Sequence, residues 1–385
     1  MLKLLQTAFR QAQRDILDEK ILRVSVANKN YGRCKQKEIS GLGHGTNKMM
    51  KIKLLFTLIC STLLLSCYAQ QPIDSTADKM LVYQLGNGGW PKQLDDKSVV
   101  NYGVALTPEL LAKIKATKDL HATFDNKATS REVVYLVKAY KKTQNKAYLT
   151  AAEKGLDYIL SAQYANGGWP QYYPDKASYR SEITYNDDAM INVLNILQDI
   201  AMQTNDFEVV NPAYIKKAEK AVTKGIDCII KTQVKQNGTL TIWAAQYDKD
   251  SMLPAKARAF EPASLSTSES AGIVRFLMRL KNPSTEVKNA IAAAVKWFDT
   301  YKIVGYRFDR NKNISALVAD HTANTWARFY DLDKNTPIFG DRDNTIKTKL
   351  EELSPERRNG YAWYGNWGQK LIEKEYPKWL TTNGK

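Results

Sequence analysis

The chain has 385 residues, of which 44% are hydrophobic and 25% charged, and this composition is ordinary for a globular protein. Its formal net charge is +16, and because residues 1–69 hold 12 Lys/Arg and 4 Asp/Glu, the remainder carries +8. Such an excess predicts attraction to polyanions, but no basic run or RNA-binding motif occurs, so we expect no nucleic acid partner.

The first 69 residues do not resemble part of a globular domain. Residues 49–53 are basic, residues 54–66 are apolar, and small residues follow, which is the pattern of a secretory signal. The apolar run is shorter than the roughly 20 residues of a membrane-spanning helix. Because such signals stand at N-termini, we interpret residues 1–48 as a start-site artefact or a disordered segment. The competing interpretation is a cytoplasmic extension with a membrane anchor.

Two processing routes fit this signal. Leu-Leu-Ser-Cys, ending at Cys67, resembles a bacterial lipoprotein box, which would place a lipid on that cysteine. Cleavage after Ala69 would instead release a soluble protein. We favour the lipid anchor slightly, and expect an exported bacterial protein that is periplasmic, secreted, or held at the outer membrane or cell surface as a monomer. The only later cysteine, Cys228, is predicted to be a small buried hydrophobe, since one cysteine forms no disulfide framework or thiolate zinc site.

From residue 78 to residue 380 we expect one catalytic domain built from helices. Apolar residues recur at helical spacing in segments 130–143, 147–163, 186–204, 213–233, 268–280 and 284–301. Predicted N-caps are Ser130, Asn186, Ser268 and Ser284. Strand-like alternation is scarce, and only short pieces such as 239–244 look extended.

A repeated corner organises these helices. The five residues NGGWP occur at positions 87–91 and again at 166–170, and a degenerate third copy follows Asn237. Each copy closes a helix and turns at Asn-Gly, and the intervals hold two helices each. A helix pair cannot cover its own apolar face, so a repeated pair implies stacking or ring closure. We therefore predict an all-α fold, an α/α toroid (an incomplete α/α barrel) whose long irregular loops form a groove at one end. Trp90 and Trp169 are interpreted as structural corners, with stacking on carbohydrate as the alternative.

Common catalytic motifs are absent from the sequence. It contains no Walker loop, no HExxH and no GxSxG. His121 and His321, the histidines after residue 69, stand in dissimilar contexts, which argues against a histidine metal site.

Paired carboxylate and amide residues do recur before helices. Asp125-Asn126 precedes one predicted helix, and Asn186-Asp187-Asp188 begins another, one repeat later. Hard cations such as Ca²⁺ prefer such oxygen ligands, although each motif alone is more typical of N-capping. Their recurrence favours one shared site.

Arginines gather in loops rich in aromatic residues. Arg258 lies in a proline-bounded loop, Arg328 and Arg342 lie in WARFYDLDKNTPIFGDRD, and Arg357 and Arg358 precede a run of aromatics. Paired guanidinium donors suit planar carboxylates, while the plainer interpretation of each is a surface ion pair.

Taken together, TFDNKATSREVVYL, NGGWPQYYP, YNDDAM, AFEPASLSTSES, WARFYDLDKNTPIFGDRD and ERRNGYAWYG resemble the family 10 pectate lyases, over about Met80 to Pro377. The resemblance implies an α/α toroid, and cleavage of α-1,4-linked polygalacturonate by Ca²⁺-assisted β-elimination to 4,5-unsaturated oligogalacturonides. Pectin-derived oligosaccharides would then be its partners. One departure is EPASLSTSES, where a glycine would be expected after SLS.

The resemblance also implies roles for particular residues. Asp125 resembles the family's calcium-binding aspartate, Asn126 a substrate contact, and Asp187 a second acidic residue at the metal. Arg258 looks like the catalytic base, and Arg328 and Arg342 look like the arginines that hold galacturonate carboxylates.

Two alternatives stay open at the level of sequence. One is a non-catalytic lipoprotein that binds acidic glycans on the same toroid. The other is a terpene cyclase-like α/α barrel, because Gln84, Gly88 and Trp90, and again Gln163, Gly167 and Trp169, match its QW repeat. The acid-rich motif that initiates such cyclisations is missing.

Overall fold

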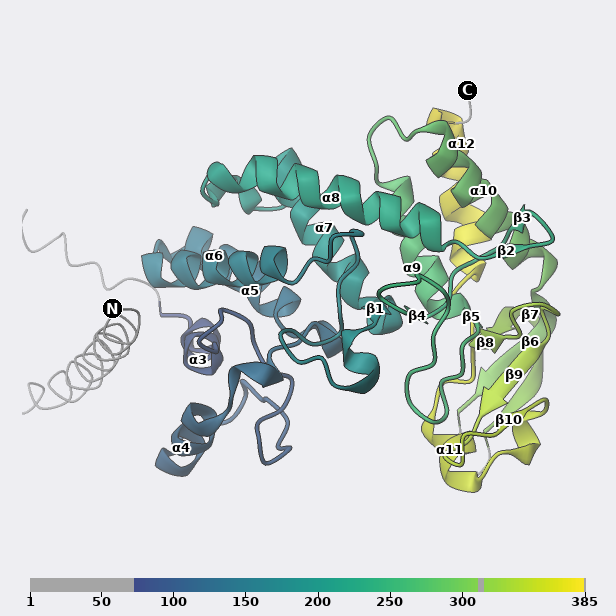
Figure 1. Cartoon of the computed structure of the whole chain (residues 1–385), viewed down its shortest axis with the longest axis horizontal. Coiled ribbons are helices and arrows are strands. Elements are labelled where there is room, and N and C mark those ends of the chain that lie inside the picture. The colour runs from purple at the N-terminus through teal and green to yellow at the C-terminus, as the bar shows by residue number, and fades with distance from the viewer. Residues whose placement is uncertain (1–72, 311–314, 384–385) are drawn as a thin grey trace, which may run out of the picture. The chain divides into compact units, whose positions relative to one another are not determined.

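In the computed structural model, helices between residues 130 and 300 pair into hairpins (Figure 1). The pairs are α5 (Ser130–Thr143) with α6 (Lys146–Ser161), α7 (Ala189–Met202) with α8 (Ala213–Thr232), and α9 (Thr267–Met278) with α10 (Thr285–Thr300). Helix α7 contacts α5 and α9, and α8 contacts α6 and α10. The hairpins therefore stack with their first helices on one layer and their second helices on another, as the repeat predicted.

Apolar spacing explains which faces these helices bury. On α8, Ala218, Ala221, Val222, Cys228 and Ile229 are buried at intervals that fall on one helical face. Cys228 is a free, buried thiol, as predicted. Helix α7 stands between neighbours and is buried around most of its circumference, which explains its high content of Ile, Leu and Val.

Helix starts follow local capping chemistry only in part. The hydroxyl of Ser284 accepts from the Val287 N–H at 3.3 Å, which confirms this predicted N-cap. The caps predicted at Ser130, Asn186 and Ser268 are wrong, since α5 begins after Thr129, α7 after Asp188 and α9 after Ser266. Asn186 opens a short 3₁₀ turn, which precedes α7.

The repeated corner is a structural joint, present in three copies. Gln84 donates to the Gly88 carbonyl and to the Ala151 carbonyl of α6, at 2.9 and 2.8 Å. Gln163 and Gln233 repeat this link, each joining its own turn to the second helix of the next hairpin. The following tryptophans are fully buried, and each indole N–H donates to a carbonyl of the preceding helix or its end; they are Trp90, Trp169 and Trp243. The structural interpretation of Trp90 and Trp169 is thus confirmed.

The expectation of an all-α fold is wrong, because the chain also builds several small antiparallel sheets, whose longest strands follow α10 (Figure 1). A long hairpin of β6 (Ile303–Asp309) and β7 (Ala316–Ala327) carries β11 (Tyr364–Gly365) on its other edge. A four-stranded sheet has the order β10 (Ile346–Lys347), β9 (Pro337–Gly340), β8 (Phe329–Tyr330), β5 (Leu265–Ser266). Two-stranded sheets pair β1 (Ile183–Thr184) with β4 (Gln246–Tyr247), and β2 (Lys235–Gln236) with β3 (Thr239–Leu240).

The arginine-bearing segments, which are the Arg258 loop before α9 and the strands and loops after α10, pack around their own apolar cluster. It is separate from the main core and contains Phe260, Phe329, Phe339 and Trp363. Strand β5 lies between the Arg258 loop and α9, and it pairs with β8, the strand that directly follows Arg328. This pairing holds the loop that carries Arg258 beside that strand. The sheets thus position the arginines against the helical layer.

The structure describes residues 73–310 and 315–383, which lie in one compact unit. The remaining elements are short: α3 (Ser75–Tyr83), α4 (Pro108–Ala116), η2 (Asp119–His121), η3 (Asp125–Lys127), η4 (Ser178–Ser181), η5 (Asn186–Asp188), η6 (Phe207–Val209), η7 (Leu350–Glu352), α11 (Pro355–Gly360), the π-helix η8 (Leu371–Glu375) and α12 (Tyr376–Asn383). The predicted signal, its upstream segment and Cys67 lie outside the described residues. Within the described part, no helix is long and apolar enough to cross a bilayer.

Candidate active site

Two matching turns, η3 and η5, present polar side chains just before α5 and α7. In each turn the central residue is left-handed, with φ of 51° at Asn126 and 53° at Asp187. A threonine precedes each turn, and its N–H donates to the carbonyl of a corner tryptophan. These bonds join Thr123 to Trp90 and Thr184 to Trp169. Asp125 therefore matches Asn186, and Asn126 matches Asp187, although we paired the two aspartates from sequence. The two turns contact each other, so both aspartates face one region.

Asp125 is buried and has an internal cation as its partner. The Lys92 ammonium pairs with its carboxylate and also lies 5.9 Å from the centre of the Tyr172 ring. The Asp125 N–H donates to the Thr123 hydroxyl at 3.0 Å, which fixes the turn. Lys92 directly follows the first NGGWP corner, and sequence reasoning missed it because nothing in the local pattern indicates this long-range pair. Asn126 next to it is exposed.

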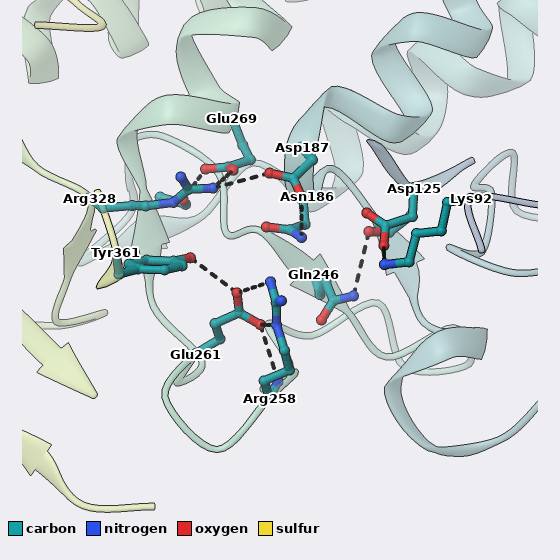
Figure 2. Close-up of polar contacts among 12 residues, drawn as sticks. Lys92, Asp125, Asn186, Asp187, Gln246, Arg258, Glu261, Glu269, Arg328 and Tyr361 are labelled. Carbon is teal, nitrogen blue, oxygen red and sulfur yellow. Dashed lines mark hydrogen bonds and ion pairs between the residues drawn. The ribbon is translucent and has the colours of Figure 1, made fainter. Parts of the chain in front are cut away.

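Asp187 lies in a network of carboxylates bridged by Arg328 (Figure 2). The Arg328 Nη2 donates to Glu269 Oε1 at 2.5 Å and lies 3.7 Å from Asp187 Oδ1. Burial raises the pKa of Asp187; the Arg328 charge opposes this shift, while the charges of Glu269 and Asp125 add to it. Burial and the neighbouring carboxylates of Glu269 and Asp187 raise the pKa of Asp188 to about 6. Crowded carboxylates of this kind favour binding of a cation.

Arg258 and Glu261 lie on the opposite side of this region, on the loop between β4 and β5 (Figure 2). Arg258 donates through Nε and Nη2 to the two Glu261 oxygens, at 2.7 and 2.6 Å. The Tyr361 hydroxyl donates to Glu261 Oε1 at 3.0 Å. Partial burial lowers the pKa of Arg258, but hydrogen bonds to Glu261 and its charge outweigh this, so that the pKa lies above its ordinary value. Glu261 belongs to the AFEPAS motif, but only Arg258, the residue that precedes this motif, was singled out from the sequence.

Arg342 packs on the same aromatic ring as Arg258. Its guanidinium lies 5.5 Å from the centre of Phe260, which also contacts Arg258 at 5.1 Å and Arg357 at 4.1 Å. Arg342 is exposed and pairs with Glu356 at 2.8 and 2.9 Å. Burial lowers the pKa of Arg357, against the charge of Glu356, and the charges of the other two arginines lower it further. The structure thus brings together most of the predicted residues, and adds Lys92, Glu261, Glu269 and Tyr361.

The oxygen donors of this site suit a hard cation, but the protein supplies only part of the ligand set. Asp125 and Asp187 offer carboxylate oxygens from two turns in contact, and Ca²⁺ takes six to eight oxygen ligands. Among the described residues, no group of three or more His, Cys, Asp or Glu side chains is arranged to hold a metal. Two aspartates would therefore need further oxygens from substrate and water.

Comparison with known proteins gives a consistent result. A family model described as pectic acid lyase matches residues 84–372. A solved family 10 polysaccharide lyase from Cellvibrio cellulosa is 36% identical with a TM-score of 0.72, covering 80% of this chain and 92% of that one. A mutant of such a lyase from the same organism, in complex with trigalacturonic acid, is 35% identical with a TM-score of 0.72, covering 81% and 93%. No curated protein matches the sequence significantly.

Proposed function

This chain belongs to the pectic acid lyase family, among the family 10 polysaccharide lyases, and we propose that it cleaves polygalacturonate by Ca²⁺-assisted β-elimination. The chain is a polysaccharide lyase with pectate lyase activity, a class that acts in pectin degradation. This membership sets aside the terpene cyclase and the purely glycan-binding alternatives. The buried Gln–Trp corners belong to the fold, so their likeness to a QW repeat carries no information about chemistry.

The reaction needs a base, and charge stabilisation on the substrate. The base takes the C5 proton of a galacturonate, the C4–O bond breaks, and the leaving oxygen takes up a proton, which leaves a 4,5-unsaturated sugar end. When bound, Ca²⁺ would neutralise the uronate carboxylate and so stabilise the negative charge that develops beside it. No water attacks, so the paired carboxylates of a glycoside hydrolase are not required.

We assign the cation to Asp125 and Asp187. Their turns are matched and in contact, and the raised pKa of Asp187 reflects burial and the nearby negative charges. In the free protein Lys92 and Arg328 stand beside these aspartates as internal cations. With Glu269, three carboxylates stand against these two cations, and this excess of negative charge favours a divalent cation, to which an anionic uronate would add a further oxygen ligand.

We assign proton abstraction to Arg258, recognition of galacturonate carboxylates to Arg328 and Arg342, and a further substrate contact to Asn126. Arg258 and Arg342 share the Phe260 ring, so their guanidiniums converge on one loop. Arginine normally stays protonated, and deprotonation at pH 7 costs roughly 7 kcal/mol at 1.36 kcal/mol per pKa unit. A nearby divalent cation lowers that cost.

The observation that carries the proposal is the convergence of the two carboxylate turns and Arg258 within a chain of this family. The test is the ultraviolet absorbance of an unsaturated uronate product. We expect the absorbance to rise on polygalacturonate with Ca²⁺ and to stop rising when EDTA is added. Release of reducing ends without that absorbance would mean hydrolysis and would contradict the proposal.

Export is a separate proposal, and it rests on residues 49–69 of the sequence alone. We propose a secreted or lipid-anchored bacterial protein, with Cys67 as the modified residue. Mass spectrometry of the mature N-terminus distinguishes a lipid-modified Cys67 from a chain that begins after Ala69. A mature chain that still carries residues 1–48 would contradict both routes.

A further inference from the structure

A cavity with a largely apolar wall and charged residues at its rim lies between α5 and α7, and Lys127 of the η3 turn contributes to its lining. Its volume is about 370 Å³, which falls in the range of small-ligand pockets. Lys127 of η3 lines it, together with Arg131 and Lys138 of α5. A smaller cavity of about 250 Å³ lies between α7 and α9, and the two share Asn192 and Asn195. We call these two adjoining cavities, one on each side of α7, the inner-helix groove.

The charges around the larger cavity are unbalanced toward positive. Lys127 and Lys138 are exposed, and neither forms an ion pair with another residue in the described part of the chain. Asp199, the carboxylate in the lining, is already paired with Arg279 at 2.6 Å and accepts from Asn205 at 3.0 Å. Arg131 pairs with Glu132 but keeps a side chain that is 44% exposed. An anion entering this cavity would therefore meet cations without displacing an existing ion pair.

The rest of the lining suits a sugar. Val134 and Ile196 give the cavity an apolar wall. Tyr135 contributes its ring, because its hydroxyl already donates toward Asp74 at 3.2 Å. The Asn192 amide nitrogen is buried and has no hydrogen-bond partner in the described structure, although a buried amide normally has one. Apolar wall, free amide donor and cationic rim together match the ring, hydroxyls and carboxylate of a uronic acid.

We propose that the inner-helix groove is a second binding site for acidic oligosaccharide, with Lys127, Lys138 and Asn192 as its recognition residues. The proposal rests on the proposed function for its choice of ligand, and it adds a site away from the Arg258 loop. Because the groove begins at the η3 turn, a polymer chain held there is kept close to the candidate active site. The groove would retain polygalacturonate between cleavage events.

Calorimetric titration with trigalacturonate in EDTA tests the site without turnover. We expect the full-length protein to bind two molecules. In the Lys127→Gln/Lys138→Gln variant one site should weaken by about tenfold or more, as expected for lost charge-assisted contacts. The Arg258→Ala/Arg342→Ala variant should instead keep the groove site and weaken the other. Circular dichroism melting of each variant verifies that it is folded.

The matched control removes the same charge from the outer layer, by Lys216→Gln/Lys220→Gln on α8. If this control weakens binding as much as the groove variant, general charge explains the effect and the proposal fails. It also fails if the groove variant binds like the wild type, or if inorganic phosphate binds the groove as tightly as the sugar. A neutral galactose trimer should not bind. Failure here leaves the lyase proposal intact, because that proposal is tested by product absorbance.

Discussion

Arg258 and Glu261 form a two-point ion pair, in which guanidinium Nε and Nη2 lie 2.7 and 2.6 Å from the two carboxylate oxygens. This is the geometry of a bidentate arginine–carboxylate pair, which is among the stronger ion pairs in proteins. The same pair keeps the guanidinium protonated in the free protein, since it raises the pKa of Arg258. A base at this position becomes competent only when its carboxylate partner is weakened or displaced.

Glu261→Gln is expected to shift the pH profile of catalysis. The pKa of Arg258 is raised by Glu261, so removing the negative charge lowers that pKa, and the rising alkaline limb of kcat/KM moves to lower pH, by about one unit. The measurement is the rate on polygalacturonate from pH 6 to pH 11. Glu356→Gln, which removes the same charge beside Arg342, is the control and should not shift the limb.

Arg258→Ala should reduce kcat by about 10²–10⁴-fold, the usual contribution of a positioned general base. Binding of trigalacturonate in the presence of Ca²⁺ should weaken much less, since Arg328 and Arg342 remain. Pre-steady-state rates and equilibrium binding separate the two effects. The wild-type rate should also rise toward alkaline pH, and a flat rate between pH 6 and pH 10 on saturating substrate would count against Arg258 as the base.

Lys92→Met is expected to strengthen Ca²⁺ binding in the absence of substrate. Lys92 neutralises Asp125, so its ammonium competes with a divalent ion for the same buried carboxylate. Removing it should lower the Kd for Ca²⁺ by about tenfold, since tenfold corresponds to only 1.4 kcal/mol. Calorimetry with Ca²⁺ on the substrate-free protein measures this. Lys118→Met, which removes an exposed lysine, should leave the Kd unchanged, and weaker binding in Lys92→Met would exclude Asp125 as a ligand.

Local chemistry made part of this molecule predictable. Asn-Gly turns, helical spacing and the Ser284 cap are encoded within a few residues, and they gave the helical hairpins and the repeated corner. The sheets could not be found in this way. Strands such as β5 and β8 have two residues each, and their pairing joins Leu265 to Tyr330 across a long sequence interval. Such short strands carry no alternation that a sequence pattern can show.

The site residues divide in the same way, into those that a local motif indicates and those that only long-range contacts identify. Asp125 and Asp187 were singled out from the sequence because each lies in a repeated motif before a helix, although the structure pairs Asp187 with Asn126 in the repeat. Lys92 and Glu269 were not identified from the sequence, because their place in the site depends only on contacts with residues distant in sequence. Arg328 was chosen for carboxylate recognition, and its present partners are the protein's own Glu269 and Asp187.

Gly167→Ala tests how much the close approach of the repeated corner to the next hairpin contributes to the stability of the fold. Gly167 has φ of +94°, and a Cβ there would lie 2.0 Å from the Lys224 carbonyl oxygen of α8. Gly238, in the third corner, has φ of +79°, but a Cβ there would have no atom within 4 Å. Both alanines suffer the left-handed backbone penalty, but only the first collides with a neighbouring helix. We expect Gly167→Ala to lower the free energy of unfolding by about 3 kcal/mol and Gly238→Ala by about 1 kcal/mol, measured by urea denaturation. Equal losses would mean that backbone conformation alone sets the requirement for glycine, and that the close approach of the corner to the next hairpin contributes nothing to stability.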